Sequence, residues 1–351
     1  MSNMEADMSR RNGAEIGLTM GDPAGIGPEI IAKSFAEDGL ASGLQAVVIG
    51  DEAVMSRTIG ALGLPLVLNV VSHPREATFG KGCVDLVPVG ALPGDLPVGR
   101  LDARCGRAAY GYVERAATLA LEGSIAAVCT APLNKEAMHL GGVEYPGHTE
   151  ILAGLTATED YAMMLVAPDL RVIHVSTHVS LGEAILRATE ARERTVIRLA
   201  HETLRRIGVQ SPRIAVAGIN PHAGENGLFG REEIEVIAPA IESARAEGID
   251  ASGPWSADTV FGRARRGDFD IVVVQYHDQG HIPVKLLGFE KGVNVTVGLP
   301  FFRTSVDHGT AFDIAGEGVA DPSSLLAALD LASRLAGSQE SHRRNEREDP
   351  A

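Results

Sequence analysis

The sequence predicts an α/β fold built on a mainly parallel sheet that helices cover on both faces. Continuous runs rich in Val, Ile and Ala recur along the chain, as in strands that are buried on both sides, and amphipathic helical stretches separate them. The chain has 351 residues, of which 45% are hydrophobic and 22% are charged. This composition suffices for one large or two ordinary domains.

The expected elements alternate in order from the first apolar run. Residues 14–20 form a strand that leads into the glycine-rich loop GDPAGIG, and a helix begins near Pro28, because proline suits the first turn of a helix. Further helices are expected over 107–123, near 190–207 and near 231–247. Further strands are expected at 44–50, 124–132, 171–178, 213–222, 270–278 and 293–300. The glycine- and proline-rich span near 80–106 is expected to be the least regular internal part.

The two ends of the chain lack apolar periodicity. Residues 1–14 are therefore expected to form a flexible leader, and the highly charged residues 338–351 a disordered, solvated tail.

Composition narrows the classes of function. A net charge of −15 argues against a nucleic-acid partner, which would favour a basic surface. No apolar stretch approaches the ~18 residues of a membrane span, and the N-terminus lacks a secretory core, so no membrane partner is expected. The three cysteines, Cys83, Cys105 and Cys129, form neither a disulfide framework nor a CxxC zinc motif. We therefore expect a cytoplasmic protein.

Three histidines lie at the ends of three of the expected strands: His178, His222 and His277. Neutral imidazole is the commonest protein ligand for metals, and the carboxyl ends of parallel strands converge where α/β folds bind ligands. A shared metal site is one interpretation, and ordinary hydrogen-bonded histidines are the other. Asp258 is a candidate fourth contributor, or it caps a turn.

Two further histidines lie near these candidates. His277 and His281 have the spacing that places two rings on one face of a helix, but Gly280 and Pro283 disfavour a helix here, so we expect no helical zinc motif. His174 lies on the same strand face as His178 and is expected to be a core or supporting histidine.

Several polar residues suit an anionic ligand. His148 and Thr149, in PGHTE, precede a helical segment whose free N–H groups favour an anion, although a plain helix cap is the alternative. The segment after His277 contains three more polar candidates, Lys285, Asn294 and Arg303. Arginine offers a planar fork to a phosphate or carboxylate group, and lysine offers a compact charge. Surface solvation would explain any one of them taken singly.

Motifs along nearly the whole folded chain, taken together, resemble the 4-hydroxythreonine-4-phosphate dehydrogenase family. The GDPAGIG loop alone matches neither common nucleotide-binding glycine pattern. The resemblance rests on TMGDPAGIGPEI (19–30), TAPLNKEA (130–137), YPGHTE (145–150), STH ending at 178, NPHAGE (220–225), YHDQG (276–280) and GVNVTVGLPFFRTSVDHGTAFDIAG (292–316).

The resemblance implies two α/β/α domains, similar to those of the isocitrate and isopropylmalate dehydrogenases, with the active site in the cleft between them. The first domain is expected over 15–133 together with 291–337 and carries the cofactor-binding segments. The second is expected over 134–290 and carries the metal site and the dimer interface. The family also implies a homodimer in which each active site takes residues from both subunits.

The resemblance also implies roles for individual residues. His178, His222 and His277 hold a divalent ion, which is zinc, magnesium, manganese or cobalt. The stretch HGTAFDIAG followed by ADP looks like an adenosine-binding segment for NAD or NADP. Lys285 is the candidate for proton transfer, and Asp258 is a second catalytic candidate. The substrate would be bound by His148, Thr149, Lys285, Asn294 and Arg303. The cofactor would be bound by His308, Gly309, Thr310, Asp313 and Asp321.

The implied reaction is oxidation of a secondary alcohol, followed by loss of a carboxylate that lies β to the new ketone. YHDQGHIPVKLLGF (276–289) and GENGLFG (224–230) are more similar to the branch that acts on 4-phospho-threonate and 4-phospho-erythronate, which yields dihydroxyacetone phosphate. The vitamin B6 branch, which oxidises 4-hydroxythreonine 4-phosphate, is the alternative, and the family includes enzymes that oxidise cyclic diol acids. A metal hydrolase or a phosphate acyltransferase on a related fold would be a different class.

Overall fold

The computed structural model describes residues 15–36, 40, 43–287 and 292–348, and the expected leader lies outside them. The chain divides into two compact units. One contains the described residues up to Thr158 together with Leu299–Gly337, and the other contains Glu159–Gly298 and the chain from Ser338 onward. These bounds differ from the expected 134 and 290.

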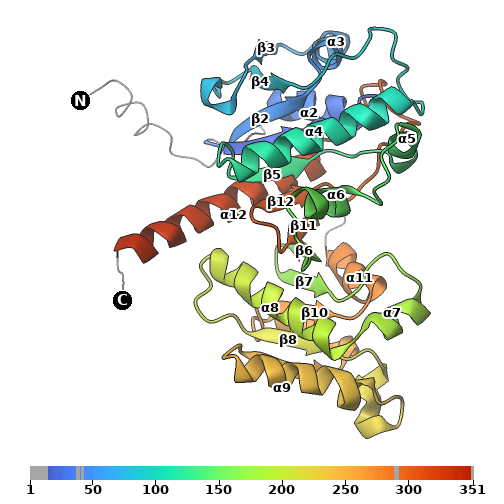
Figure 1. Cartoon of the computed structure of the whole chain (residues 1–351), viewed down its shortest axis with the longest axis vertical. Helices are drawn as coiled ribbons and strands as arrows, with labels where there is room; N and C mark the ends of the chain where they lie inside the picture. The colour runs from blue at the N-terminus through green and yellow to red at the C-terminus, as the bar shows by residue number, and fades with distance from the viewer. Residues whose placement is uncertain (1–14, 37–39, 41–42, 288–291, 349–351) are drawn as a thin grey trace. The chain divides into compact units, whose positions relative to one another are not determined.

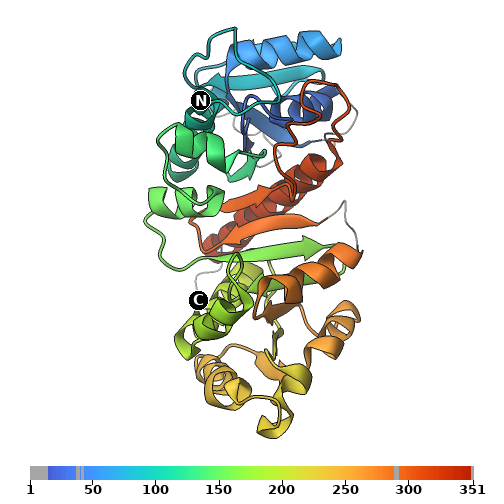
Figure 2. The ribbon, with the colours of Figure 1, turned by 90° about the vertical axis from the view of Figure 1, so that its right-hand side faces the viewer.

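Packing explains both differences. Helices α5 (Lys135–Leu140) and α6 (His148–Leu155) pack on α4 (Ala103–Leu121) of the first unit. Strand β11 (Val293–Val297) pairs with β6 (Ala162–Ala167) of the second unit. The mixed α/β fold itself is confirmed, and Figures 1 and 2 show the helices and sheet strands of each unit.

The described strands of the first unit are all parallel, in the order β3-β4-β2-β1-β5-β12. Helix α4 packs on β1, β2 and β5, while α2 packs on β4 and α3 on β3. The strand bounds are β1 Glu15–Thr19, β2 Gln45–Gly50, β3 Val67–Val70, β4 Cys83–Pro88, β5 Ala127–Thr130 and β12 Phe302–Ser305. The remaining helices are α2 Gly27–Ala36, α3 Glu52–Leu62 and α12 Ser323–Glu348, of which the part up to Gly337 belongs to this unit, and a short 3₁₀ turn lies at Pro74–Glu76.

The strands of the second unit follow the order β11-β6-β7-β10-β8-β9. The neighbouring strands β7, β10, β8 and β9 are parallel to one another, whereas β6 is antiparallel to both of its neighbours, β11 and β7. The other strands are β7 Leu170–His174, β8 Ile214–Ala217, β9 Ala251–Trp255 and β10 Ile271–Val274. The helices are α7 Leu181–Arg187, α8 Glu190–Arg206, α9 Ala238–Ala246, α10 Ala257–Arg265 and α11 His277–Leu287, with a 3₁₀-type turn at Pro221–Gly227 and a π-helical turn at Glu233–Ile237.

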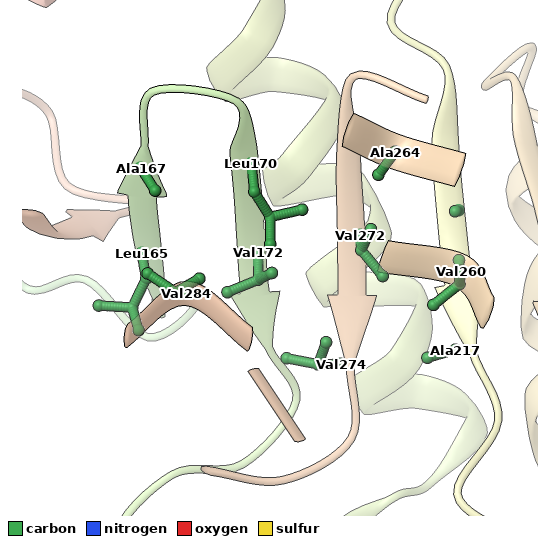
Figure 3. Close-up of a cluster of buried hydrophobic side chains, with 11 residues drawn as sticks. Leu165, Ala167, Leu170, Val172, Ala217, Val260, Ala264, Val272, Val274 and Val284 are labelled. Carbon is green, nitrogen blue, oxygen red and sulfur yellow. The ribbon is translucent and has the colours of Figure 1, made fainter. Parts of the chain in front are cut away.

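Helices cover both faces of this second sheet. Val260 and Ala264 of α10 and Val284 of α11 pack on one face in a buried cluster with residues such as Val172 and Val272 (Figure 3). Alternate strand residues point the other way and are equally buried, and α8 packs on β8 and β10 and on α9. Figure 2 shows α8 and α9 on one side of this unit and α10 and α11 on the other.

The strands and helices expected from the sequence all occur, and most of the strands are shorter than expected. The last expected helix begins as the π-helical turn and continues as α9. Short strands β3, β4, β6, β9 and β12 were not among the expected elements, and β4 lies inside the span expected to be irregular.

Two expectations are wrong. Residues 338–348, expected to be a disordered tail, continue helix α12. Their Glu, Arg and Gln residues are good helix formers, and a helix that has already nucleated extends at little cost.

The second error concerns residues 277–287, which form helix α11 despite Gly280 and Pro283. Gly280 is required by close packing, because a Cβ atom there would lie 2.5 Å from His174 Nε2 and 2.8 Å from Val274 Cγ2. The burial of Gln279, His281 and Val284 outweighs the one helical hydrogen bond that Pro283 cannot make.

Candidate active site

Neighbouring parallel strands of the second unit carry the three candidate metal ligands in the loops after their carboxyl ends. His178 follows β7, His277 follows β10 and His222 follows β8, and these strands are adjacent in the order β7-β10-β8. The rings of His178 and His277 lie with centroids 5.8 Å apart and planes tilted by 46°. The fold therefore brings two of the predicted ligands together.

His277 is held in a defined orientation. Its Nδ1 lies 2.7 Å from Asp278 Oδ1, and because a carboxylate accepts, Nδ1–H donates. The ring stacks on His281 with centroids 3.6 Å apart and planes within 10°. This arrangement directs the lone pair to Nε2, the tautomer that suits a metal ligand. The stacking of His277 on His281 was not expected, since it depends on α11 being a helix.

His222 lies in a different setting from the other two. Its side chain is 61% exposed, and its Nδ1 lies 3.9 Å from Asp258 Oδ2, which is beyond hydrogen-bond range. Asp258 itself accepts a 2.6 Å hydrogen bond from Ser256 Oγ at the start of α10. Of the three candidate metal ligands, His222 is the one for which a short distance to Asp258 is recorded among the described residues.

The imidazole donors fit the chemistry of a divalent ion, but the described residues of one chain do not bring three such donors together. Among the described residues, no group of three or more His, Cys, Asp or Glu side chains is placed to hold a metal. His178 with His277, and His222 with Asp258, are the pairs that the chain assembles.

His174 is a core histidine, as expected. Its ring is 1% exposed, its Nδ1 lies 3.1 Å from the carbonyl oxygen of Met163, and its ring centroid is 4.9 Å from that of His281. Burial, reinforced by the neighbouring His281, lowers the pKa of His174 to about 3. The ring is therefore neutral and packs beneath α11.

The first unit contains a buried arginine, Arg303, among the predicted substrate-binding residues. Arg303 on β12 is 3% exposed, and its Nε and one terminal nitrogen donate to Thr130 Oγ1 at 3.2 and 2.6 Å. Burial lowers the pKa of this guanidinium to about 10, while Cys129 and Glu150 act in the opposite direction. A guanidinium with that pKa remains charged at neutral pH, which suits an anionic ligand.

His148 begins α6 close to this arginine. The N-cap residue, Gly147, makes no side-chain cap, so a plain side-chain cap does not explain the PGHTE motif. Burial, with Arg303 and Lys135 as cationic neighbours, lowers the pKa of His148 well below its usual value, so the ring is neutral. Its buried Nε2 has no hydrogen-bond partner in the described structure, and Thr149 beside it is half-buried.

The remaining predicted substrate residues lie in the second unit. Lys285 is half-buried on α11, eight residues after His277. Asn294 lies on β11 opposite Leu165, and its buried Oδ1 has no hydrogen-bond partner among the described residues. An unsatisfied buried oxygen marks a place where a ligand donor would be favourable.

The predicted cofactor segment packs against the glycine-rich loop of the first unit. Ile26 N donates to the carbonyl oxygen of Thr310 at 3.0 Å, and a Cβ atom at Gly25 would lie 3.0 Å from Thr310 Cβ. Glycine at position 25 therefore permits the two segments to approach. Thr310 is buried, whereas His308, Gly309 and Asp313 are exposed.

An ion pair fastens the next part of this segment. Glu29 accepts hydrogen bonds from the backbone of Gly318 and Ala320, and Lys33 donates to the carbonyl oxygens of the same two residues. Asp321 accepts from Ser323 N and Oγ at 2.8 and 2.6 Å, so it caps α12. Asp321, predicted to bind the cofactor, thus has a structural contact in this chain. Glu29 and Lys33 were not predicted to contact this segment. Their i, i+4 spacing in an expected helix indicated only that they could pair with each other.

Comparison with known proteins shows the class. A family model described as "Pyridoxal phosphate biosynthetic protein PdxA" matches residues 43–332. The chain belongs to this PdxA family and is an oxidoreductase of the dehydrogenase type. Membership implies a nicotinamide cofactor and a metal ion.

Individual relatives cover nearly the whole chain. A "D-threonate 4-phosphate dehydrogenase" from Cupriavidus necator is 56% identical over 322 residues, which are 92% of this chain and 97% of the relative. A "4-hydroxythreonine-4-phosphate dehydrogenase" from Beijerinckia indica is 52% identical over 320 residues, 91% and 94% of the two chains. The crystal structure of a 4-hydroxythreonine-4-phosphate dehydrogenase from Klebsiella pneumoniae is 51% identical, with a TM-score of 0.89 over 93% of this chain and 98% of that one.

Within the described residues, no helix combines the length and the apolar character that crossing a membrane requires.

Proposed function

We propose that this chain is an NAD(P)- and divalent-metal-dependent dehydrogenase that oxidises the C3 alcohol of a 4-phosphorylated four-carbon hydroxy acid, 4-phospho-threonate or 4-phospho-erythronate. The 3-keto acid formed loses its C1 carboxylate as carbon dioxide, which leaves dihydroxyacetone phosphate. The observation that carries the substrate class is the buried Arg303 beside the neutral His148 and the N-terminus of α6. The sugar-acid branch is favoured by 56% identity to a relative named for D-threonate 4-phosphate.

In this proposal, different residues of the chain bind the substrate's anionic group, bind its hydroxyl groups and move its proton. Arg303 and the N–H groups at the start of α6 bind an anionic group of the substrate, and His148 and Thr149 add hydrogen bonds. Asn294 offers its unsatisfied oxygen to a substrate hydroxyl. Lys285 supplies a second positive charge and is the candidate for moving the proton of the C3 hydroxyl, with Asp258 as the alternative.

His178, His222 and His277 would hold the divalent cation, with Asp278 fixing the His277 tautomer. When bound, that cation supplies a Lewis acid that polarises the substrate's C–O bond, and the nicotinamide accepts the hydride. The segment from His308 to Asp321 would hold the adenosine part of the cofactor, because it is fastened to the glycine-rich loop and leaves His308, Gly309 and Asp313 exposed.

We further propose that two copies assemble so that each completes the other's site. Helices α7 and α11, which lie next to His178 and His277 in sequence, expose Leu181, Leu186, Ile282 and Leu286 by 56–81%. Large apolar side chains that are exposed in one chain are typical of an interface between subunits.

A substrate panel tests the reaction. Metal-replete enzyme with NAD, and separately with NADP, is offered 4-phospho-threonate, 4-phospho-erythronate and 4-hydroxythreonine 4-phosphate, and NAD(P)H absorbance and dihydroxyacetone phosphate are measured. We expect kcat/KM at least about tenfold higher for the C2-hydroxyl acids, a difference of ~1.4 kcal/mol in the transition state. A preference for 4-hydroxythreonine 4-phosphate would assign the chain to the vitamin B6 branch instead. If none of the three reduces the cofactor, the proposed reaction is wrong.

A further inference from the structure

A buried carboxylate lies beneath the loop that carries His222. Glu233, in the π-helical turn, is 2% exposed, and its Oε1 accepts from the backbone N–H groups of Ile219 and Asn220 at 2.8 and 2.7 Å. Its Oε2 accepts from Asn220 Nδ2 at 3.0 Å, and Glu232 accepts from the same nitrogen at 2.6 Å. Glu233 thus holds the two residues at which the chain leaves β8 and turns toward His222.

The turn that follows needs such an anchor. Residues 222–226 all have positive φ, between 42° and 79°, and four of the five are not glycine. Left-handed backbone is unfavourable for residues with a side chain, so the surrounding structure must enforce it. The exception, Gly224, is where a Cβ atom would lie 2.7 Å from Glu233 Oε2, so the turn is built around this carboxylate.

A second buried side chain joins this loop to helix α11. Gln279 lies two residues after His277 and is 8% exposed. Its Nε2 donates to the carbonyl oxygen of Gly218 at 2.8 Å, and its Oε1 accepts from Gln275 N at 2.7 Å. Gln275 Nε2 in turn donates to the carbonyl oxygen of Ala217 at 2.9 Å. The end of β8 is therefore held from the Glu233 side and from the His277 side at once.

We propose that Glu233 and Gln279 are positioning residues, which fix the backbone from which His222 projects as a ligand of a divalent cation. They form a brace of two buried side chains, one on each side of residues 217–220. The inference rests on the proposed function, because it assumes that His222 and His277 are metal ligands. Neither residue touches substrate or cofactor in this role. Each acts through the backbone that carries a histidine.

The variant Glu233→Gln tests the first half of the brace without changing its size. An amide has one acceptor oxygen where the carboxylate has two, so its NH₂ group must face either Asn220 Nδ2 or two backbone N–H groups. Glu235→Gln is the matched control, because Glu235 lies in the same turn and pairs with Arg231 at the surface. Gln279→Met tests the second half, because it keeps the length of the side chain and removes both hydrogen bonds.

Binding of Co²⁺ to the metal-free protein is measured by calorimetry and by the visible absorption of the bound ion. We expect Glu233→Gln and Gln279→Met each to raise the Kd by roughly 10- to 100-fold, as is usual for residues that orient metal ligands. The Co²⁺ spectrum should change with them, and Glu235→Gln should match the wild type in both. Thermal unfolding of each metal-free variant confirms that it folds.

A double-mutant cycle separates positioning from general destabilisation. In a His222→Ala background, Glu233→Gln should change the Kd by less than about twofold, because the ligand through which it acts is gone. An equal effect in both backgrounds, or an unchanged Kd in the single variants, would overturn the brace while leaving the metal site intact. A wild-type protein that binds Co²⁺ no better than His222→Ala would instead overturn the proposed metal site, and the brace with it.

Discussion

Arg303 shows how a single residue can concentrate positive charge in an acidic protein. The chain carries a net charge of −15, yet this guanidinium is 3% exposed and lies next to the neutral His148. A planar fork held by Thr130 presents its remaining N–H groups in a fixed direction. A lysine at this position would keep the charge and lose the fork.

We therefore expect Arg303→Lys to lower kcat/KM by roughly 10- to 150-fold, the equivalent of the ~1.5–3 kcal/mol that a hydrogen bond to a charged group contributes. Most of the loss should appear as a higher KM, because the contact serves an anionic group in the ground state as well. Arg198→Lys, in a surface pair with Glu247, is the control and should have no effect on turnover. Activity of Arg303→Lys within twofold of the wild type would remove this arginine from the substrate site.

Glu193 is a second residue whose surroundings decide its chemistry. Its side chain is fully buried, and burial raises its pKa to about 8, although Gln275 and Arg192 act in the opposite direction. The folded state thus holds a proton that the unfolded state releases above pH 4.5. The contribution of Glu193 to the free energy of unfolding is therefore largest below pH 4.5, and it decreases as the pH rises toward 8.

Glu193→Gln should remove this dependence. Between pH 5 and 8, the melting temperature of the metal-free wild type should fall relative to that of the variant, so that the variant gains stability over the wild type as the pH rises. Differential scanning calorimetry at several pH values measures the difference, and the other titrating groups cancel in the comparison. A constant difference between the two proteins would show that Glu193 does not titrate in this range.

Helix α11 is a single element whose residues have several different roles. It begins with His277, buries Gln279 and His281 beneath that residue, packs Val284 on the sheet and exposes Ile282 and Leu286. Helix α7, which begins three residues after His178, exposes Leu181 and Leu186 in the same way. An interface built on these helices would place a partner subunit next to the candidate metal ligands.

Leu186→Arg and Leu286→Arg should therefore shift the protein from dimer to monomer. Burial of one leucine contributes ~1.5–3 kcal/mol, and a two-fold axis counts each substitution twice, so the dimer should lose about 3–6 kcal/mol. Light scattering after size exclusion measures the mass, and Co²⁺ binding should weaken together with dimerisation. Val67→Arg, at a 67% exposed position on β3, is the control. Dimers that persist in both leucine variants would place the interface elsewhere.

At the scale of the whole molecule, the charge balance makes a bound cation important. An anionic substrate approaches an acidic protein unfavourably unless local positive charge is concentrated at the site. In the proposed site, the buried Arg303 would provide part of that charge, and a divalent ion on the histidines would provide the rest.

Removal of the metal should therefore affect both turnover and stability. Chelation should abolish NADH formation, and Zn²⁺, Mn²⁺, Co²⁺ or Mg²⁺ added singly identifies the ion that restores it. A cation at 100 times its Kd should stabilise the folded state by about 2.7 kcal/mol, which appears as a higher melting temperature. His222→Ala should keep the metal-free melting temperature and lose the increase. Full turnover after exhaustive chelation would exclude a metal-dependent reaction.

The order of strands and helices was predictable from local patterns, because apolar periodicity and glycine or proline turns act over a few residues. The failures have longer-range causes. Helix α11 forms because Gly280 fits against His174 and Val274, and strand β6 pairs antiparallel with β11, about 130 residues further along the chain. The helical continuation of α12 depends on a nucleus formed earlier in the same helix.

The sequence by itself determined the α/β class, the residue types at the strand ends and the family. Only the tertiary structure decided which of these residues meet: His178 with His277 at 5.8 Å, and His222 with Asp258 at 3.9 Å. It also decided that Glu233 and Gln279 are buried beneath the His222 loop, where nothing in their own motifs marks them. The physical reason is that side-chain type is local information, whereas burial and hydrogen-bond partners arise from segments that only folding brings together.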